Sequence, residues 1–187
     1  DLHSFPTRRS SDLSLWQIDD DRIIKDFNWR RGGYGEVTLD RALEVSSNIG
    51  ISKTIWSLFK GHEQDYFNKL DSMSFGQPNN IEGIEGLHSS VYNSPKDSDW
   101  VNKDILWSAI GYDRKIAPIQ MLTFYNAIAN NGKMVRPTLV PGTTEVINEQ
   151  IAKSENVALM LQTLEHVVSL GLGKLAGCER IKVAGKT

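Results

Sequence analysis

The stretch that decides the fold is Glu44–Lys53, "EVSSNIGISK", where three polar residues interrupt an apolar pattern. Thr38 is typical of a helix N-cap, so we expect a short helix to start just after it, and apolar residues at helical spacing predict a second helix over residues 51–59. Ser and Asn bond nearby backbone groups and are therefore common in turns and caps. Taken alone, the two serines and the asparagine predict a turn between two helices.

Outward from this turn, the chain alternates helical patterns with breaks. Pro118 is typical of a first helical position, and the helix that it opens is expected to stop at Asn130. A further short helix fits residues 63–73, and Ser154 is expected to cap an amphipathic helix. The stripe expected to be buried in the helix from residue 118 consists of Ile119, Leu122, Tyr125 and Ala129, widened by Met121 and Ile128. The residues between 76 and 103 are rich in Gly, Pro, Asn and Ser and predict a long surface excursion.

Composition is that of an ordinary globular protein. The chain has 187 residues, of which 40% are hydrophobic and 24% charged, and its formal net charge is −2. No basic block alternates with aromatic residues, which argues against nucleic-acid binding. Cys178 is the only cysteine, so the sequence holds no internal disulfide framework. No apolar run of membrane-spanning length occurs in the sequence.

Three short motifs suggest cofactor or metal sites but lack required residues. The "AGKT" at the end of the sequence lacks the first glycine of a phosphate-binding loop, because Arg180 stands at that position. The "GLGKLA" of residues 171–176 follows a helix rather than a strand, which is the reverse of a dinucleotide-binding turn. The "HEQDY" from His62 to Tyr66 has no second histidine for zinc. We therefore expect no metal and no organic cofactor.

Two motifs far apart in the sequence are more informative together. Ser46-x-Asn48 and Lys186-Thr187 resemble two of the three signatures of the penicillin-recognising serine acyltransferases, which are Ser-x-x-Lys, Ser-x-Asn and Lys-Thr-Gly. The residues around these motifs extend the likeness. Segments 33–53, 108–137 and 183–187 are similar to the transpeptidase domain of class B penicillin-binding proteins, most of all to the division-specific FtsI type.

This resemblance implies a fold and a reaction. The fold would be α+β, a helix-rich part of the penicillin-binding-protein and β-lactamase-like transpeptidase fold with its antiparallel sheet largely missing. The last residues, 178–187, alternate apolar with charged or small side chains as a strand does. The reaction would be that of a peptidoglycan DD-transpeptidase, which cross-links stem peptides through a serine acyl-enzyme and binds penicillin.

The resemblance also assigns roles to four residues. It implies that the Ser46 hydroxyl relays a proton toward the leaving amine, since a hydroxyl both donates and accepts. Asn48 would hold the substrate backbone and the catalytic lysine. Lys186 would supply positive potential, and Thr187 a hydroxyl for the substrate carboxylate. The strand edge beside them would pair with an extended peptide.

One required element is not found in its expected place. In this family the nucleophile motif precedes Ser-x-Asn by more residues than this sequence holds, so the nucleophile serine is expected to be absent. The Ser-x-x-Lys that does occur, Ser57–Lys60, follows the turn, and we interpret it as a chance match. The last glycine of Lys-Thr-Gly is also absent. We accordingly expect the 187 residues by themselves to be poorly stable and inactive.

The first residues are expected to be foreign. His3–Leu13, "HSFPTRRSSDL", resembles one reading frame of a common sequencing adapter, so residues 1–13 are interpreted as a disordered artefact and residues 14–187 as a partial transpeptidase domain. Such a piece implies a longer protein anchored in the cytoplasmic membrane, with this domain in the periplasm. Its partners would be stem peptides, β-lactams, and the membrane proteins of cell division and glycan polymerisation.

Two other functions remain open on the sequence. A β-lactam hydrolase or sensor has the same fold, although Ser47 stands where class A β-lactamases carry aspartate, which favours a synthetic enzyme. A non-catalytic division scaffold could also keep the fold and bind partners without acylation.

Overall fold

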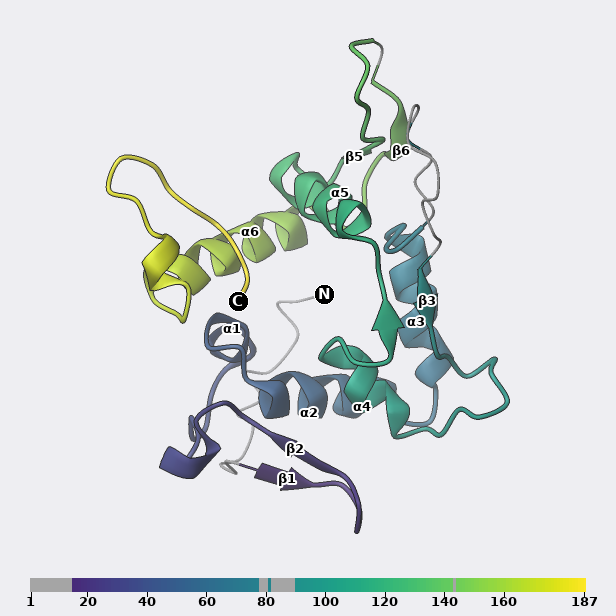
Figure 1. Cartoon of the computed structure of the whole chain (residues 1–187), viewed down its shortest axis with the longest axis vertical. Helices are drawn as coiled ribbons and strands as arrows, with labels where there is room; N and C mark the ends of the chain where they lie inside the picture. Colours follow the sequence, from purple (N-terminus) through teal and green to yellow (C-terminus); the bar gives the residue numbers. More distant parts are fainter. Residues whose placement is uncertain (1–14, 78–80, 82–89, 143) are drawn as a thin grey trace. The chain divides into compact units, whose positions relative to one another are not determined.

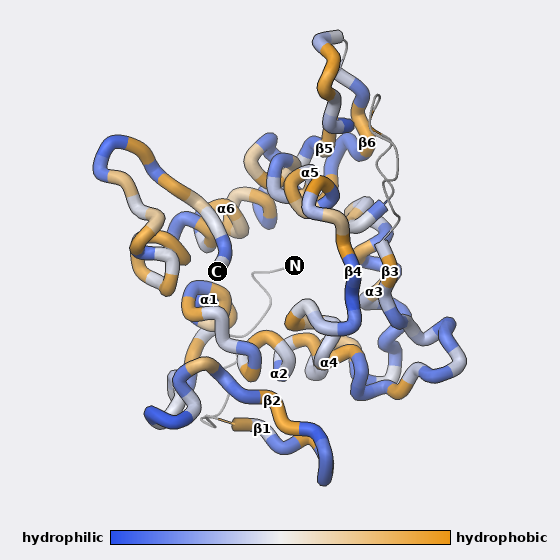
Figure 2. Tube along the Cα trace, in the orientation of Figure 1, coloured by the Kyte–Doolittle hydropathy of each residue, from blue (hydrophilic) through white to orange (hydrophobic). Residues whose placement is uncertain are grey.

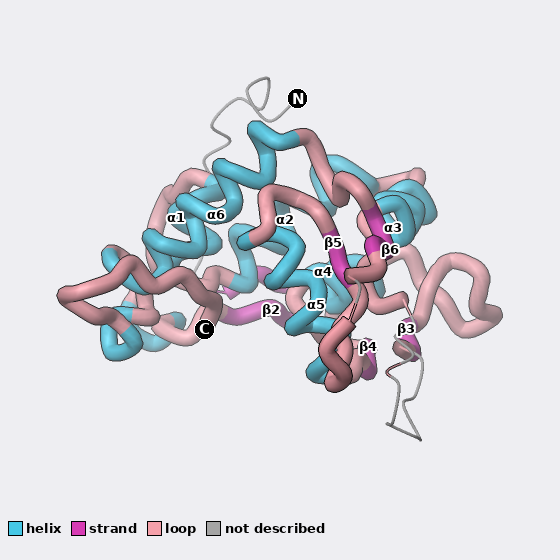
Figure 3. Tube along the Cα trace, turned by 90° about the horizontal axis from the view of Figure 1, so that it is seen from above, coloured by secondary structure: helices cyan, strands magenta, loops and turns pink. Residues whose placement is uncertain are grey.

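The computed structural model describes residues 15–77, 81, 90–142 and 144–187. The chain divides into two compact units, the first formed by residues 1–60, 105–110 and 162–187, and the second by residues 61–104 and 111–161. The segment interpreted as an adapter lies outside the described residues, as does part of the predicted surface excursion. Figure 3 shows that helices dominate the described chain and that its strands are short.

The first unit combines a β-hairpin with helices. Its elements are β1 (Leu15–Gln17), β2 (Ile23–Lys25), the 3-10 turn η2 (Trp29–Arg31), α1 (Leu39–Glu44), α2 (Asn48–Phe59), most of α4 (Asp104–Ala109), the second half of α6 (Ser154–Ser169) and the 3-10 turn η3 (Lys174–Ala176). Strands β1 and β2 pair antiparallel, with Trp16 opposite Ile24. The order of these elements can be followed in Figure 1.

Helix α1 begins where the sequence predicts. The Thr38 hydroxyl accepts the N–H of Arg41 at 3.2 Å, which is the N-cap bond expected of this residue. Helices α1 and α2 pack closely at Gly50: a Cβ added there would lie only 2.7 Å from the Cβ of Ala42. Apolar and polar residues alternate along α2 and α6 in Figure 2, as expected of helices with one buried face. The buried apolar residues of this unit are Ile24, Ala42, Val45, Ile49, Ile105, Leu106, Leu164, Val167 and Val168.

The second unit has two small sheets and helices. Its elements are α3 (Glu63–Ser72), β3 (Val91–Tyr92), β4 (Arg114–Lys115), α5 (Pro118–Ala129), β5 (Met134–Val135), β6 (Val146–Asn148) and the first half of α6. Strand β3 pairs antiparallel with β4, and β5 pairs antiparallel with β6. The mixed α+β class with short antiparallel sheets is confirmed.

The sequence prediction was only partly right about which face of α5 is buried. Helix α5 starts at Pro118 and buries Ile128 as expected, but Leu122 is 63% exposed and the buried positions include Gln120 and Thr123. These polar side chains are buried because they are hydrogen-bonded: Gln120 donates to the carbonyl of Gln77 at 3.0 Å, and Thr123 donates to that of Ile119 at 2.7 Å. Periodicity of apolar residues alone does not reveal such bonds.

The predicted strand over residues 178–187 is also wrong. The structure forms no β-ladder there among its described residues. A strand is defined by pairing with a neighbour, and instead the Gly185 N–H donates to the carbonyl of Leu164 on α6 at 3.1 Å. The segment therefore runs beside a helix. No helix within the described residues is long and apolar enough to cross a membrane.

Candidate active site

The polar turn between α1 and α2 is held by two adjacent serines in different ways. Ser46 has a φ of 51°, a left-handed conformation that is uncommon for a residue with a side chain. Ser47 is buried and caps α2, because its hydroxyl oxygen accepts the N–H of Gly50 at 3.0 Å. The structure thus gives Ser47 a folding role and turns the half-buried Ser46 side chain in another direction.

A buried carboxylate that the sequence reading missed anchors this turn. Asp26 is only 4% exposed and follows strand β2. Its two oxygens accept the Ser47 hydroxyl at 2.8 Å and the Ile49 N–H at 3.1 Å. A negative charge is favourable at the N-terminus of a helix, where the first N–H groups have no partner inside the helix. Asp26 therefore ties the β-hairpin to the start of α2.

The end of the described chain reaches the same turn. The Lys186 ammonium donates to the Ser46 hydroxyl at 2.5 Å, across a sequence separation of 140 residues. The Ser46 and Thr187 hydroxyls lie 2.7 Å apart, and Lys186 also donates to the main-chain oxygen of Thr187 at 2.7 Å. The two motifs singled out from the sequence are thus in direct contact within one unit.

Asn48 occupies the first turn of α2 but has a different partner. Its side-chain amide donates to the carbonyl of Lys25 at 3.0 Å, and so fixes the helix start to β2. Of the four residues predicted for the site, the structure joins Ser46, Lys186 and Thr187 by hydrogen bonds and places Asn48 two residues further along the same turn.

Burial changes the electrostatics of the lysine. Desolvation by surrounding protein atoms lowers the pKa of Lys186 below its usual value, although the side chain stays solvent-accessible. A lysine with a lowered pKa is more easily deprotonated, and it lies against a hydroxyl. This arrangement is suited to moving a proton between the two groups.

The second Ser-x-x-Lys match has no comparable geometry. The Ser57 hydroxyl donates to the carbonyl of Thr54 in its own helix at 2.8 Å. The Lys60 ammonium lies 5.4 Å from the centre of the Trp56 ring. Each side chain is engaged locally, which agrees with the interpretation of Ser57–Lys60 as a chance match.

A cavity of about 650 Å³ lies along α6 and the segment after it. Its lining includes His166, Lys174, Cys178 and Ile181 but none of the four predicted site residues. Within the part of the chain that the structure describes, no group of three or more His, Cys, Asp or Glu side chains is arranged to hold a metal ion.

Comparison with known proteins identifies a family. The chain matches the family model of the penicillin binding protein transpeptidase domain over residues 6–187, a range that starts inside the segment interpreted as an adapter. It is 28% identical over 193 residues to penicillin-binding protein 3 of Bacillus subtilis, covering 91% of this chain and 27% of that protein. It is 26% identical over 156 residues to peptidoglycan D,D-transpeptidase FtsI of Escherichia coli, covering 82% of this chain and 25% of that protein.

Solved structures agree on the fold. The apo structure of the TP domain of penicillin-binding protein 3 from Burkholderia pseudomallei has a TM-score of 0.82 at 22% identity, covering 100% of this chain and 54% of that one. A peptidoglycan glycosyltransferase from Burkholderia ambifaria has a TM-score of 0.77 at 23% identity, covering 100% and 57%. The chain spans about a quarter of the length of the curated relatives it matches. Because the family model covers nearly the whole chain, the protein belongs to the family of penicillin binding protein transpeptidase domains.

Proposed function

We propose that the chain is part of a serine DD-transpeptidase that cross-links peptidoglycan stem peptides and is acylated by penicillin. The observation that carries this proposal is the hydrogen bond between Lys186 and Ser46 across 140 residues. The family match and the FtsI relative support the same reaction. We propose further that the nucleophile serine lies upstream of these 187 residues and that they are inactive by themselves.

In the proposed reaction, the nucleophile hydroxyl attacks the carbonyl carbon between the last two D-alanines of a stem peptide. A new ester bond forms, the peptide C–N bond breaks, and the proton of the nucleophile ends on the departing amine. Ser46 is suited to pass that proton, because its hydroxyl already contacts both Lys186 and Thr187. An acceptor amine from a second peptide then attacks the ester carbonyl: a new peptide bond forms, the ester C–O bond breaks, and a proton from the amine returns to the nucleophile oxygen.

The remaining residues would position the donor peptide. Lys186 supplies positive charge near the terminal carboxylate, and the Thr187 hydroxyl is available to donate to it. Asn48 is proposed to hold the substrate backbone with its side-chain carbonyl oxygen, since its amide nitrogen is committed to Lys25. These assignments require neither a metal nor an organic cofactor.

We propose the cytoplasmic membrane as the anchor of the longer protein, with this domain in the periplasm. The division-specific type is our preferred assignment because an FtsI protein is among the relatives. Stage V sporulation protein D of Bacillus subtilis is also similar, at 28% identity over 171 residues covering 85% of this chain and 26% of that protein. The proposed protein partners, by the same resemblance, are the membrane proteins of cell division and of glycan polymerisation.

The test uses the gene extended upstream until a Ser-x-x-Lys motif precedes Ser46, and downstream until Lys-Thr-Gly is complete. The extended protein is expected to become covalently labelled by a fluorescent penicillin. Ser46→Ala should slow labelling by at least about 100-fold, the usual contribution of a positioned proton-transfer group. Ser57→Ala is the matched control, because it removes a hydroxyl of the same kind that is engaged only with its own helix.

Other outcomes distinguish the alternatives. A folded extended protein that is never labelled would contradict the proposal and favour a division scaffold. Labelling followed by rapid release of hydrolysed penicillin would favour a β-lactam hydrolase. Equal rates for the wild type and Ser46→Ala would refute the role of Ser46 as proton relay.

A further inference from the structure

One turn of helix α6 contacts both segments that form the candidate site. The carbonyl of Leu164 accepts the N–H of Gly185 at 3.1 Å, one residue before the Lys-Thr pair. Two residues further along α6, Nδ1 of His166 lies 3.2 Å from a carboxylate oxygen of Glu44, and Glu44 is two residues before Ser46. Because a helix is stiff over a single turn, the spacing between these two contacts is fixed. The position of one segment relative to the other therefore depends on α6.

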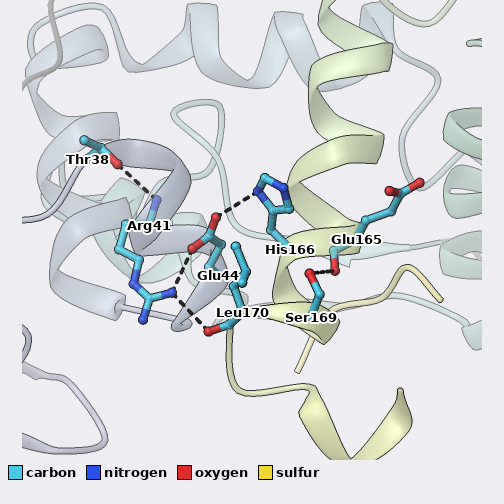
Figure 4. Close-up of polar contacts among 7 residues, drawn as sticks. All are labelled: Thr38, Arg41, Glu44, Glu165, His166, Ser169 and Leu170. Atoms are coloured by element: carbon cyan, nitrogen blue, oxygen red, sulfur yellow. Dashed lines mark hydrogen bonds and ion pairs between the residues drawn. The ribbon is translucent and has the colours of Figure 1, made fainter. Parts of the chain in front are cut away.

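Glu44 is a buried carboxylate, and Figure 4 shows its two side-chain partners, Arg41 and His166. It is 7% exposed, and its second oxygen accepts from the Arg41 guanidinium at 2.8 Å. The same guanidinium nitrogen donates to the carbonyl of Leu170 at 3.2 Å, and the main-chain oxygen of Glu44 accepts the Leu172 N–H at 3.2 Å. An unpaired buried charge is strongly unfavourable, so these partners are needed to keep Glu44 where it is.

The contacts of Glu44 matter because Ser46, two residues later, has an unfavourable backbone conformation. A left-handed φ in a residue with a side chain persists only where neighbouring structure determines it. On the downstream side, Ser47 and Asp26 hold the turn to β2. On the upstream side, Glu44 holds it to α6 through His166. Loss of the upstream attachment would let the turn relax and the Ser46 hydroxyl move away from the end of the chain.

We propose that Glu44 and His166 are positioning residues that keep the Ser46 hydroxyl within hydrogen-bond distance of Lys186. The proposal deepens the proposed function and rests on it, because the pair that is positioned is the one assigned to proton relay. Glu44 and His166 act through α1 and α6, and their partners in the structure are protein groups on those elements and on the loop that follows α6.

The experiment measures Lys186 directly in the 187-residue chain and needs no enzymatic activity. Competitive labelling of amines with acetic anhydride at a series of pH values, followed by mass spectrometry, gives the apparent pKa and the reactivity of each lysine. Lys133 serves as internal reference, because it forms an exposed ion pair with Glu149 in the other unit. The matched variants are His166→Asn, whose amide can replace the donor at Nδ1, and the isosteric His166→Leu, which has no donor.

We expect His166→Leu to raise the apparent pKa of Lys186 toward that of a free lysine, so that the fraction of neutral amine at fixed pH, and with it the rate of acetylation, falls by about threefold or more. His166→Asn should leave that pKa at the wild-type value, and Lys133 should change in neither variant. Glu44→Leu, which removes both acceptor oxygens while keeping a similar size, tests the other partner of the bond and should behave as His166→Leu does. Circular dichroism verifies that each variant retains its helices.

Three results would overturn the proposal. The first is an unchanged Lys186 pKa in both His166→Leu and Glu44→Leu. The second is an equal shift in His166→Leu and His166→Asn, which would assign the effect to packing rather than to the hydrogen bond. The third is a parallel change at Lys133, which would indicate general loosening. Since the measurement reports geometry, its outcome is independent of whether the extended protein is labelled by penicillin.

Discussion

Removal of the Asp26 carboxylate should destabilise the start of α2 more than any other single change at the turn. Asp26→Ala deletes the acceptor for the Ser47 hydroxyl and for the Ile49 N–H, both of which are buried. A hydrogen bond to a charged group contributes about 1.5–3 kcal/mol, and a negative charge at a helix N-terminus adds about 0.3–1 kcal/mol. With two such bonds and the helix-terminus contribution, the expected loss in free energy of unfolding is about 3–7 kcal/mol.

Two further variants, Asp26→Asn and the control Asp40→Asn, separate the effect of the hydrogen bonds from the effect of charge. Asp26→Asn keeps one oxygen acceptor and should lose about half as much as Asp26→Ala, because the charge is gone but a neutral hydrogen bond remains. Asp40→Asn is the matched control: Asp40 lies exposed in the first turn of α1, where a charge change should alter stability by only about 0.3–1 kcal/mol.

Urea denaturation followed by circular dichroism gives the free energies of unfolding for this series. If the free energy of unfolding of Asp26→Ala lies within about 1 kcal/mol of the wild-type value, the hairpin is not held by these bonds. The reasoning would fail equally if Asp40→Asn cost as much as Asp26→Ala, since net charge rather than the buried bonds would then be responsible.

Further predictions concern a close backbone contact, an ion pair and the alternative serine motif. Gly171→Ala should destabilise the protein by about 2 kcal/mol or more, because the added Cβ would collide with the last carbonyl of α1. Gly142→Ala is the control and should leave stability unchanged, because a Cβ there would meet open space. Thermal denaturation of both variants tests this. The hydrogen bond from Arg136 lowers the pKa of Glu145. The stability that this bond contributes is therefore present above the usual carboxyl pKa of 4.5 and is lost as pH falls through the lowered pKa. An NMR titration in which Arg136→Gln leaves the Glu145 midpoint unchanged would contradict this. In the extended protein, Ser57→Ala should label with penicillin at the wild-type rate, and a lower rate would restore that serine as a candidate.

Local signals in the sequence predicted local structure well. Thr38 caps α1 and Pro118 opens α5, because capping and a fixed φ are properties of the residues themselves. The convergence of Ser46 and Lys186 came from resemblance rather than from any local rule, and the contact between them agrees with it. Local residue preferences thus predict where helices begin, whereas the long-range contact between Ser46 and Lys186 was predicted only from the resemblance to a known family.

The features that the sequence reading missed depend on tertiary partners. Asp26 is not distinguished from the other acidic residues by the sequence, and only the structure shows that it binds the first turn of α2; its position two residues after the apolar pair Ile23–Ile24 was a usable signal. Nothing in the sequence singles out Glu44, which is buried where His166 of α6 and the loop after α6 contact it. The buried face of α5 was misassigned because Gln120 is satisfied by hydrogen bonds to other segments. Such cases are decided by neighbours that lie far away in the sequence.

The two adjacent serines have a consequence for variation in this protein. Ser47 serves folding, since it joins the α2 cap to Asp26, whereas the Ser46 hydroxyl faces the end of the chain. A library that randomises both positions should therefore separate into two phenotypes. Substitutions at position 47 should lower the amount of folded protein, while many at position 46 should leave abundance intact and change only chemistry. Position 47 would then report on the amount of folded protein, and position 46 on catalysis, independently of each other.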